Sequence, residues 1–318
     1  MIDAVITWVD GDDPGHAHKR AAYAKLAEPG RMPAGLDESR FRTSFELYYC
    51  VHLIRRHMDW IDRIHLVTDG QRPEWLSDKV AQGLGLAVVD HSTIFRGFED
   101  VLPVFNSKSI EAVLHRIPGL APAFLYFNDD IFVLRPTPRE AFFTAAGARW
   151  RGRFHYGFRL ENWVSALLGA GGVEREASYL KPGREREFLG RKITFQCAHS
   201  PHPFFRDVLA DCFAQESSLR HQIAYRFRSH EQMTIPNLVA NAAFMRGAAV
   251  WGRDDWGYVH GRFDGDDAVL GVLERVRCDA GVRCLCVQEA DQMTPLSRLR
   301  VERLLADALS RSRLDAVQ

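Results

Sequence analysis

Two adjacent carboxylates at the end of an apolar run are the residues best suited to chemistry. Asp129 and Asp130 follow the apolar run 124–127 and Asn128, and a second apolar run covers 131–134. Adjacent carboxylates repel each other, so a half-buried pair makes sense if it holds a hard cation, Mg²⁺ or Mn²⁺, shared with a phosphate. A solvated turn or a helix cap is the alternative interpretation.

Further carboxylates follow the first apolar run of the chain, residues 4–9. Asp10, Asp12 and Asp13 come directly after it, and a plain Asp-Gly turn would explain them equally well. Arg42 and Glu46 stand four residues apart in a segment of helical pattern. Taken alone, that spacing is typical of a surface ion pair.

The second half of the chain offers a histidine and an arginine. His199 lies in a proline-stiffened segment, 197–203, that leads into a helical pattern, and Arg228 lies in a Phe-Arg-Ser-His segment. A histidine near neutral pKa can take a hydroxyl proton, and an arginine can hold phosphate oxygens bidentately. Ordinary surface or core roles are the alternatives. Residues 278–286 hold three cysteines at a spacing that matches no usual zinc pair.

Short apolar runs that alternate with helical patterns must position these residues. The runs 4–9, 64–68, 86–89 and 124–127 each end in polar residues, such as Asp69 and Gly70 after the second run. Between them, Leu47, Val51, Ile54 and Met58 recur at the spacing of one buried helical face, residues 110–117 have a similar pattern, and Thr294 and Pro295 open a last helix. This alternation predicts a mainly parallel sheet covered by helices, with ligands bound at the carboxyl ends of its strands.

Composition excludes several classes of protein. The 318 residues are 46% hydrophobic, and 41 basic residues balance 41 acidic ones, so a non-specific nucleic-acid binder is not expected. P-loop, dinucleotide-binding, HExxH and GxSxG motifs are absent from the sequence. With six scattered cysteines and neither a signal peptide nor an apolar run long enough to span a bilayer, we expect a cytoplasmic protein. Peripheral attachment to the membrane through a protein partner stays open.

An ordered series of motifs resembles the Stealth family of bacterial capsular-polysaccharide phosphotransferases, which are related to the animal N-acetylglucosamine-1-phosphotransferase. The motifs cover residues 2–144 densely, and a weaker block runs from His199 to Ser229. The dense block comprises IDAVITWVDGDDP (2–14), Phe41-Arg42 with Glu46-Leu47, IHLVTDGQRPEWL (64–76), LPVFNS (102–107), Ile110-Glu111, HRIPGL (115–120) and FLYFNDD (124–130).

The resemblance implies transfer of a sugar-1-phosphate from a nucleotide-sugar, with a UDP-sugar as the expected donor, to a hydroxyl of a glycan acceptor. It also implies a Rossmann-like, nucleotide-sugar-binding (GT-A-like) α/β core with C-terminal helical additions. Carried over, His199, Arg228 and Asp130 are the expected catalytic residues, with His199 accepting the acceptor's proton unless the acid and base roles are exchanged with another residue. Mg²⁺ or Mn²⁺ would be held by Asp129, Asp130 and Glu289. The expected substrate-binding residues are Asp10, Gly11, Arg42, Glu46, Asp69, Gly70, Asn106, Ser107 and Asn128.

Because this site draws on both halves, we expect residues 1–318 to form one catalytic unit. Its parts would be an α/β core (1–145), an irregular insertion or lid (146–196) and a mainly helical part (197–318). The chain departs from the family in having Thr43-Ser44 in place of an Asp-Asn pair, and Gln288-Glu289 in place of Asn-Asp. Two other functions stay open: an ordinary glycosyltransferase that releases nucleoside diphosphate, and a catalytically impaired nucleotide-sugar-binding protein.

Overall fold

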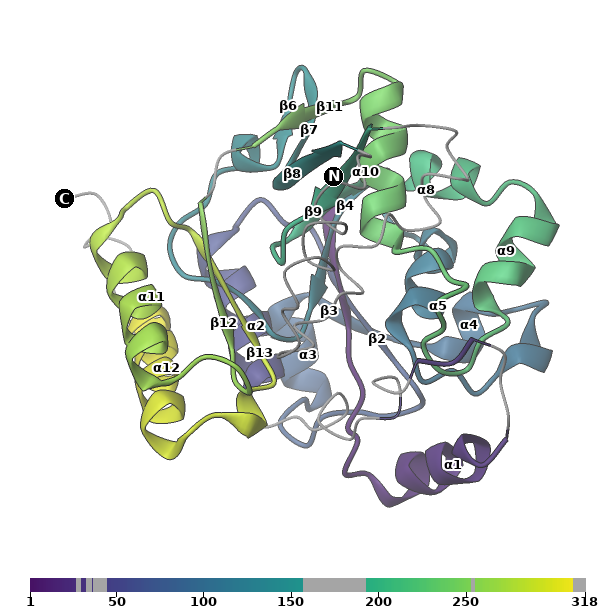
Figure 1. The fold of residues 1–318 in the computed structure, drawn as a ribbon, viewed down its shortest axis with the longest axis horizontal. Coiled ribbons are helices and arrows are strands. Elements are labelled where there is room, and N and C mark those ends of the chain that lie inside the picture. The colour runs from purple at the N-terminus through teal and green to yellow at the C-terminus, as the bar shows by residue number, and fades with distance from the viewer. Residues whose placement is uncertain (27–29, 33–35, 37–44, 157–192, 253–254, 311–318) are drawn as a thin grey trace, which may run out of the picture.

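The computed structural model describes residues 1–26, 30–32, 36, 45–156, 193–252 and 255–310 (Figure 1). Arg42, Thr43 and Ser44 lie outside the described residues, as does most of the predicted insertion 146–196.

A five-stranded sheet forms the centre, in the order β10-β4-β1-β2-β3. Its parallel strands are β1 (Ile2–Thr7), β2 (Ile64–Thr68), β3 (Leu86–Asp90) and β4 (Ala123–Asn128), and β10 (His202–Phe205) is antiparallel to β4. The predicted α/β class with a mainly parallel sheet is confirmed. The order 3-2-1-4 reverses between β1 and β4, so the crevice between their carboxyl ends is the ligand-binding position typical of open α/β sheets.

The helix predicted from the buried spacing around Val51 is confirmed as α2. Its apolar residues Leu47, Val51 and Ile54 are buried, and basic residues occupy its last turn. The last helix is confirmed too, because Thr294 caps its first turn by accepting from the amide of Ser297 at 3.1 Å. The helices are α1 (Pro14–Ala24), α2 (Glu46–His57), α3 (Asp78–Leu84), α4 (His91–Ile94), α5 (Ser107–Ala112), α8 (Arg206–Cys212), α9 (Glu216–Ile223), α10 (Ile235–Met245), α11 (Asp266–Cys278) and α12 (Pro295–Ser310).

The helix expected over residues 110–117 has different bounds in the structure. Helix α5 begins earlier, at Ser107, and ends at Ala112, and a single 3₁₀ turn (Leu114–Arg116) follows it. The earlier start has a local cause, since the side chain of Asn106 accepts a hydrogen bond from the amide of Ser109 at 3.1 Å and so caps the helix.

Smaller sheets join distant parts of the chain. In one of them β5, which directly follows Asp130, pairs with β13, and β13 pairs with β12. The bounds of the remaining strands are β5 (Ile131–Val133), β6 (Phe143–Thr144), β7 (Gly147–Trp150), β8 (Gly152–Tyr156), β9 (Ile193–Cys197), β11 (Ala249–Trp251), β12 (Trp256–His260) and β13 (Cys284–Gln288). On the left of Figure 1, β12 and β13 lie beside α11 and α12, and α12 contacts α2 from the first part of the chain.

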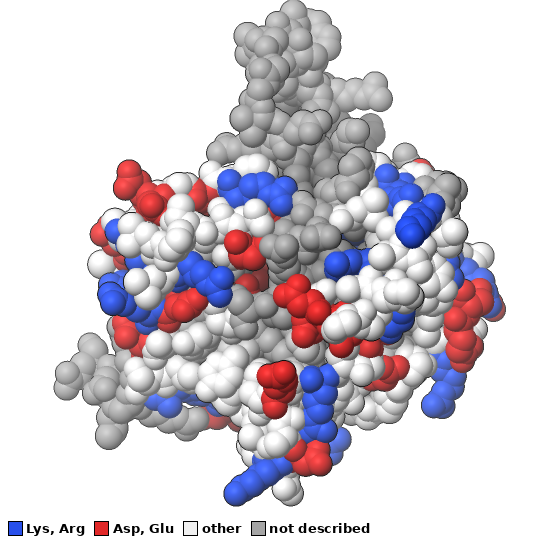
Figure 2. Space-filling view, turned by 90° about the horizontal axis from the view of Figure 1, so that it is seen from below, with Lys and Arg blue, Asp and Glu red and all other residues white. Residues whose placement is uncertain are grey.

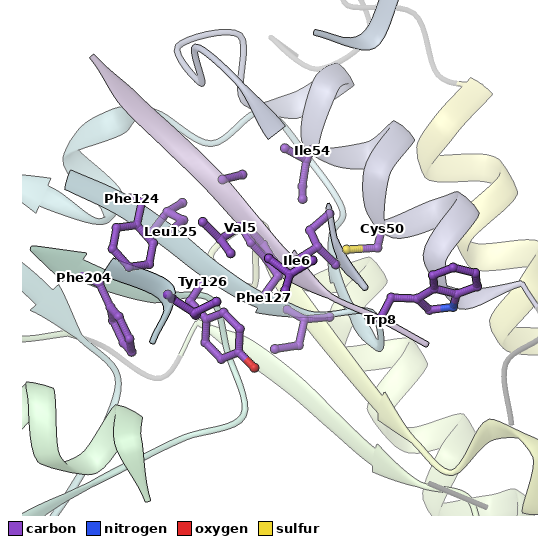
Figure 3. Packing of buried hydrophobic residues seen from close by; sticks show 14 of the residues in the cluster. Val5, Ile6, Trp8, Cys50, Ile54, Phe124, Leu125, Tyr126, Phe127 and Phe204 are labelled. Atoms are coloured by element: carbon purple, nitrogen blue, oxygen red, sulfur yellow. The ribbon is translucent and has the colours of Figure 1, made fainter. Parts of the chain in front are cut away.

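Buried hydrophobic side chains of β1, β4 and β10 pack together in the core (Figure 3). Val5 and Ile6 of β1 and Phe124 and Phe127 of β4 are fully buried, and Phe204 of β10 packs edge-on against Phe124 at 5.3 Å. Burying each such side chain stabilises the fold by roughly 1.5–3 kcal/mol. The strands that end at the candidate site are therefore rigidly supported.

Candidate active site

The acidic pair emerges where the strand order reverses. Thr7, the last residue of β1, is in register with Asn128, the last residue of β4, and Asp129 and Asp130 form the turn into β5. Figure 2 views the molecule from the edge at which β1 ends, and acidic groups lie near the middle of that face with basic groups around them. The predicted position of the pair, at the carboxyl end of a buried strand, is confirmed by this geometry.

Glu46 intensifies the negative charge at this turn. It is the first residue of α2 and is buried. Burial, then the charges of Asp130 and Glu46, raise the pKa of Asp129 well above its ordinary value. Burial and Glu46 raise the pKa of Asp130 to about 7, even though the thiol of Cys286 and the charge of Arg228 act in the opposite direction. Such a group of carboxylates is costly to ionise and is suited to a positively charged partner.

A hard cation fits part of this arrangement. The Oδ1 atom of Asp130 is buried and has no hydrogen-bond partner. A buried carboxylate oxygen of this kind is suited to bind a cation. Within the described ranges, no three or more His, Cys, Asp or Glu side chains are grouped so that they could hold a metal ion. Mg²⁺ is commonly held by one or two protein carboxylates together with substrate phosphates and water. Asp129 and Asp130 are two carboxylates that could bind Mg²⁺ in this way.

Glu289 lies at the end of β13, where its backbone is left-handed with φ 51°. The strand itself is close to the acidic turn, because the amide of Val287 donates to the carbonyl of Asp130 at 3.0 Å. The Oε2 atom of Glu289, however, pairs with Nε of Arg262 at 3.0 Å. Its role as a third metal ligand stays a prediction.

Arg228 joins the site from the second half of the chain. Its Nη2 atom donates to the hydroxyl of Ser107 at 3.0 Å, and its charge counteracts the effect of burial on the pKa of Asp130 and of Glu111. The neighbouring Phe227 stacks on Phe105 with ring centroids 5.2 Å apart. Arg228 therefore contacts Ser107 and is near enough to Asp130 for its charge to act there, and its catalytic role stays a prediction.

A buried polar network at the same place was not predicted. The hydroxyl of Tyr126 lies 3.0 Å from Oγ1 of Thr7, 3.0 Å from Oε1 of Glu111 and 2.8 Å from Oδ1 of Asn128. Burial raises the pKa of Glu111. The charge of Arg228 and hydrogen bonds from Tyr126 and Ser107 partly offset this rise. A single acid among apolar residues 110–114 and a tyrosine inside an apolar strand were the available signals.

His199 lies between β9 and β10, and the described contacts connect it to the β12–β13 pair. Its Nδ1 atom is 3.3 Å from Nε2 of Gln288, and its ring is 5.1 Å from the ring of Tyr258. His202 nearby is a different kind of histidine: burial, then the charges of His199 and Arg151, lower its pKa to about 3, and it stacks between Tyr126 and Trp150. Of the two histidines, His199 is the half-exposed one.

Some predicted substrate-binding residues have structural contacts. Asn106 caps α5 and also donates to the carbonyl of Tyr225 at 2.6 Å, so it holds the segment that carries Arg228. Asp69 forms an ion pair with Lys19 at 2.6 Å.

The remaining ones lie in turns near the ends of β1 and β2. The backbone amide and carbonyl of Asp10 bind the side chain of Gln71 at 2.9 and 2.8 Å, Gly11 is buried in the turn that follows, and Gly70 has φ 66°. Asp13 caps α1 by accepting from the amide of His16 at 2.7 Å. The roles of Asp10, Gly11 and Gly70 in substrate binding stay predictions. The zinc alternative finds no support among the described residues, where Cys284 and Cys286 are buried and Cys278 is exposed.

Comparison with known proteins shows what the chain is similar to. Residues 2–25 match Stealth protein CR1, conserved region 1, and residues 40–150 match Stealth protein CR2, conserved region 2. The capsular polysaccharide phosphotransferase LcbA of Aeromonas hydrophila is 31% identical over 273 residues, which are 82% of this chain and 71% of that protein. LcbA of Neisseria meningitidis is 43% identical over 146 residues, 46% of this chain and 38% of that protein. An exopolysaccharide phosphotransferase of Streptomyces coelicolor is 34% identical over 255 residues, 78% of this chain and 41% of that protein.

The chain spans about two fifths of the length of most of these curated relatives. Among solved structures, the galactosyltransferase LgtC in complex with donor and acceptor sugar analogues covers 98% of this chain and 97% of its own at 14% identity, with a TM-score of 0.45. No helix in the described part of the chain is both long and apolar enough to cross a bilayer. By the match to Stealth regions 1 and 2 and by the extent of the Aeromonas relative, the chain belongs to the Stealth protein family.

Proposed function

We propose that this protein transfers a sugar-1-phosphate from a nucleotide-sugar, with a UDP-sugar as the expected donor, to a glycan hydroxyl. The reaction would form a phosphodiester in capsular or other cell-surface polysaccharide and release a nucleoside monophosphate. The observation that carries the proposal is the position of Asp130 at the end of β4, where the strand order reverses, with the positive charge of Arg228 near enough to act on its pKa. The names of relatives, which are capsular and exopolysaccharide phosphotransferases, support it.

In the proposed reaction the acceptor oxygen forms a bond to the phosphorus attached to the sugar, and the bond from that phosphorus to the nucleoside monophosphate breaks. Phosphoryl transfer depends mainly on positioning and on charge stabilisation. Arg228, which donates from Nη2 to the hydroxyl of Ser107, would stabilise the phosphate oxygens. A divalent ion on Asp129 and Asp130 would supply neutralisation of the diphosphate charge.

His199 is the third proposed participant. A neutral imidazole serves as a proton acceptor or as a hydrogen-bond donor, depending on which ring nitrogen carries the proton and faces the reacting atoms. The sequence-based expectation is that His199 accepts the proton of the acceptor hydroxyl. We propose that the reaction takes place on the cytoplasmic side. Peripheral association with a polysaccharide assembly complex at the inner face of the membrane stays open.

The test is a donor screen with UDP-sugars and other nucleotide-sugars, glycan acceptors, and Mg²⁺ or Mn²⁺, with products identified by mass spectrometry. The proposal predicts nucleoside monophosphate and an acceptor heavier by one sugar phosphate. Nucleoside diphosphate would instead identify an ordinary glycosyltransferase. A protein that binds donors without turnover, and whose His199→Ala variant leaves the polymer made in cells unchanged, would be the catalytically impaired binding protein.

A further inference from the structure

Gln288 stands between Tyr258 and His199 at the end of β13. The hydroxyl of Tyr258 donates to Oε1 of Gln288 at 2.6 Å, and Nε2 of Gln288 is 3.3 Å from Nδ1 of His199. All three side chains are half-buried. The backbone keeps them together, because β12 and β13 pair in parallel with His260 opposite Gln288, and the rings of His199 and Tyr258 are 5.1 Å apart.

The two distances determine which way the amide faces. A separation of 2.6 Å is typical of an O–H donor to an oxygen and is shorter than the usual N–H to oxygen distance of about 2.9 Å. Oε1 of Gln288 therefore faces Tyr258, and its NH₂ group faces His199. An amide nitrogen can only donate, so Nδ1 of His199 has to be the acceptor.

This hydrogen bond selects one form of the imidazole. When Nδ1 accepts, the proton of the neutral ring must be on Nε2. A doubly protonated ring would direct an N–H group at the NH₂ group of Gln288, so the contact also favours the neutral ring. Two titratable groups near His199 in the described part of the chain are Tyr258, on β12, and His202, on β10. The lowered pKa of His202 keeps it uncharged near neutral pH.

We propose that Gln288 is a positioning residue that holds His199 neutral with its proton on Nε2. His199 then serves as a hydrogen-bond donor to a phosphate oxygen rather than as the general base. In the transfer, the new bond joins the acceptor oxygen to phosphorus, the bond to the nucleoside monophosphate breaks, the acceptor's proton leaves to solvent, and the Nε2 proton stays on the ring. The identity of that oxygen rests on the proposed function, whereas the state of the ring does not.

The deciding experiment is long-range ¹H–¹⁵N NMR of the 318-residue chain with ¹⁵N-labelled histidine, at neutral pH, without divalent metals. Comparison with His199→Gln identifies the signals of this ring among those of the 13 histidines. We expect the proton of His199 on Nε2. A proton on Nδ1, or a doubly protonated ring, overturns the proposal, whether or not the chain transfers sugar phosphate.

The matched variant is Gln288→Glu, which keeps the side-chain length but replaces the donor with an acceptor. We expect the neutral ring to move its proton to Nδ1 and the pKa of His199 to rise by about one unit or more. Unchanged nitrogen signals would show that Gln288 does not control the ring and would overturn the proposal. Tyr258→Phe is the second variant, and a mixture of both tautomers is expected because the amide is then free to turn over. Circular dichroism checks that each variant is folded.

Kinetics separate this inference from the proposed function. If the chain releases nucleoside monophosphate, Gln288→Glu should lower kcat at least tenfold and leave the KM for the donor within about twofold, because charge stabilisation acts mainly in the transition state. An equal kcat in both proteins contradicts the donor role of His199. If no donor is turned over, the proposed function fails while the NMR result still decides the state of the ring.

Discussion

The guanidinium of Arg228 and the hydroxyl of Ser107 are 3.0 Å apart although 121 positions separate them in sequence. Two further contacts fix the same juxtaposition, because the amide of Phe105 donates to the carbonyl of Arg226 at 2.7 Å and Phe105 stacks on Phe227. Ser107 thus holds the arginine itself, and Phe105 holds the two residues that precede the arginine. Its position follows from the fold and does not require a bound substrate.

Replacing this arginine tests its role in charge stabilisation. Arg228→Lys keeps the positive charge but loses the planar, forked donor set, so we expect nucleoside monophosphate release to fall by about 100-fold or more with little change in stability. The measurement is kcat and KM with the best donor from the screen. Arg220→Lys changes an exposed arginine of the neighbouring α9 and should keep wild-type rates. Activity of Arg228→Lys within threefold of the wild type would remove Arg228 from the mechanism.

The segment that carries Arg228 depends on Gln232. The Oε1 atom of this buried residue accepts from the amide of Ser229 at 3.0 Å, and its Nε2 atom donates to Oγ of Ser109 at 2.9 Å and to the carbonyl of Gln222 at 2.8 Å. Gln232→Leu removes all three hydrogen bonds, and each buried polar group that is left unsatisfied costs about 1–3 kcal/mol. We expect a lower free energy of unfolding in urea and, for the protein that is still folded, a reduced kcat. Wild-type stability would show that water or another group replaces the amide.

Asp130 should reduce the stability of the metal-free protein. Its pKa is raised by burial and by Glu46 to about 7, so ionisation destabilises the fold as the pH rises through the range from its unfolded value to about 7. Without metal, Asp130→Asn should therefore have a higher Tm than the wild type at about pH 8, and the difference should shrink at about pH 5. Differential scanning calorimetry with EDTA measures this. The exposed Asp12→Asn is the control, and a pH-independent difference would contradict the assignment.

Added Mg²⁺ or Mn²⁺ gives the complementary result. If Asp129 and Asp130 hold the ion, added metal stabilises the native wild-type protein by mass action and raises its Tm, while Asp130→Asn responds little. Donor nucleotide should enlarge the wild-type response, because the diphosphate would complete the coordination. An equal response of both proteins to metal would place the ion elsewhere.

The buried pair of Asp3 and His65 predicts acid sensitivity. Burial acts to raise the pKa of Asp3, but hydrogen bonds from His65 at 3.0 Å and from the amide of Ala121 at 2.9 Å outweigh it and lower the pKa. The stabilising contribution of Asp3 is therefore present above its unfolded pKa and is lost as the pH falls through its folded value. Asp3→Asn should cost about 3 kcal/mol at neutral pH and less in acid, measured by urea denaturation at both pH values. Asp78→Asn, in an exposed ion pair, should change little.

The local sequence pattern was sufficient to predict the strands that position this site. The apolar runs that became β1, β2 and β4 end in polar residues, and parallel pairing brings those ends to one edge, so the position of Asp129 and Asp130 followed from sequence. The antiparallel pairing of β10 with β4, and of β13 with β5, joins residues far apart in sequence and has no local signal.

The buried partners of the site were harder to predict for the same reason. Neither Glu111 on its helix nor Tyr126 in its strand indicates a site by itself. Their importance comes from their contact, in which the tyrosine hydroxyl and Oε1 of the acid are 3.0 Å apart. The same holds for Gln288, because the role inferred for its amide depends on its contacts with Tyr258 and His199, which the sequence does not show.

The two antiparallel pairings also affect how a truncated chain would behave. Residues 1–150 include β4 and β5, but the strands that cover their outer edges, β10 and β13, come from the remainder of the chain. A fragment that ends near residue 150 would expose two unpaired strand edges lined by buried residues such as Phe124 and Phe132, which is a typical template for aggregation. A fragment of residues 1–150 is therefore expected to be insoluble by itself and to become soluble when the rest of the chain is co-expressed with it.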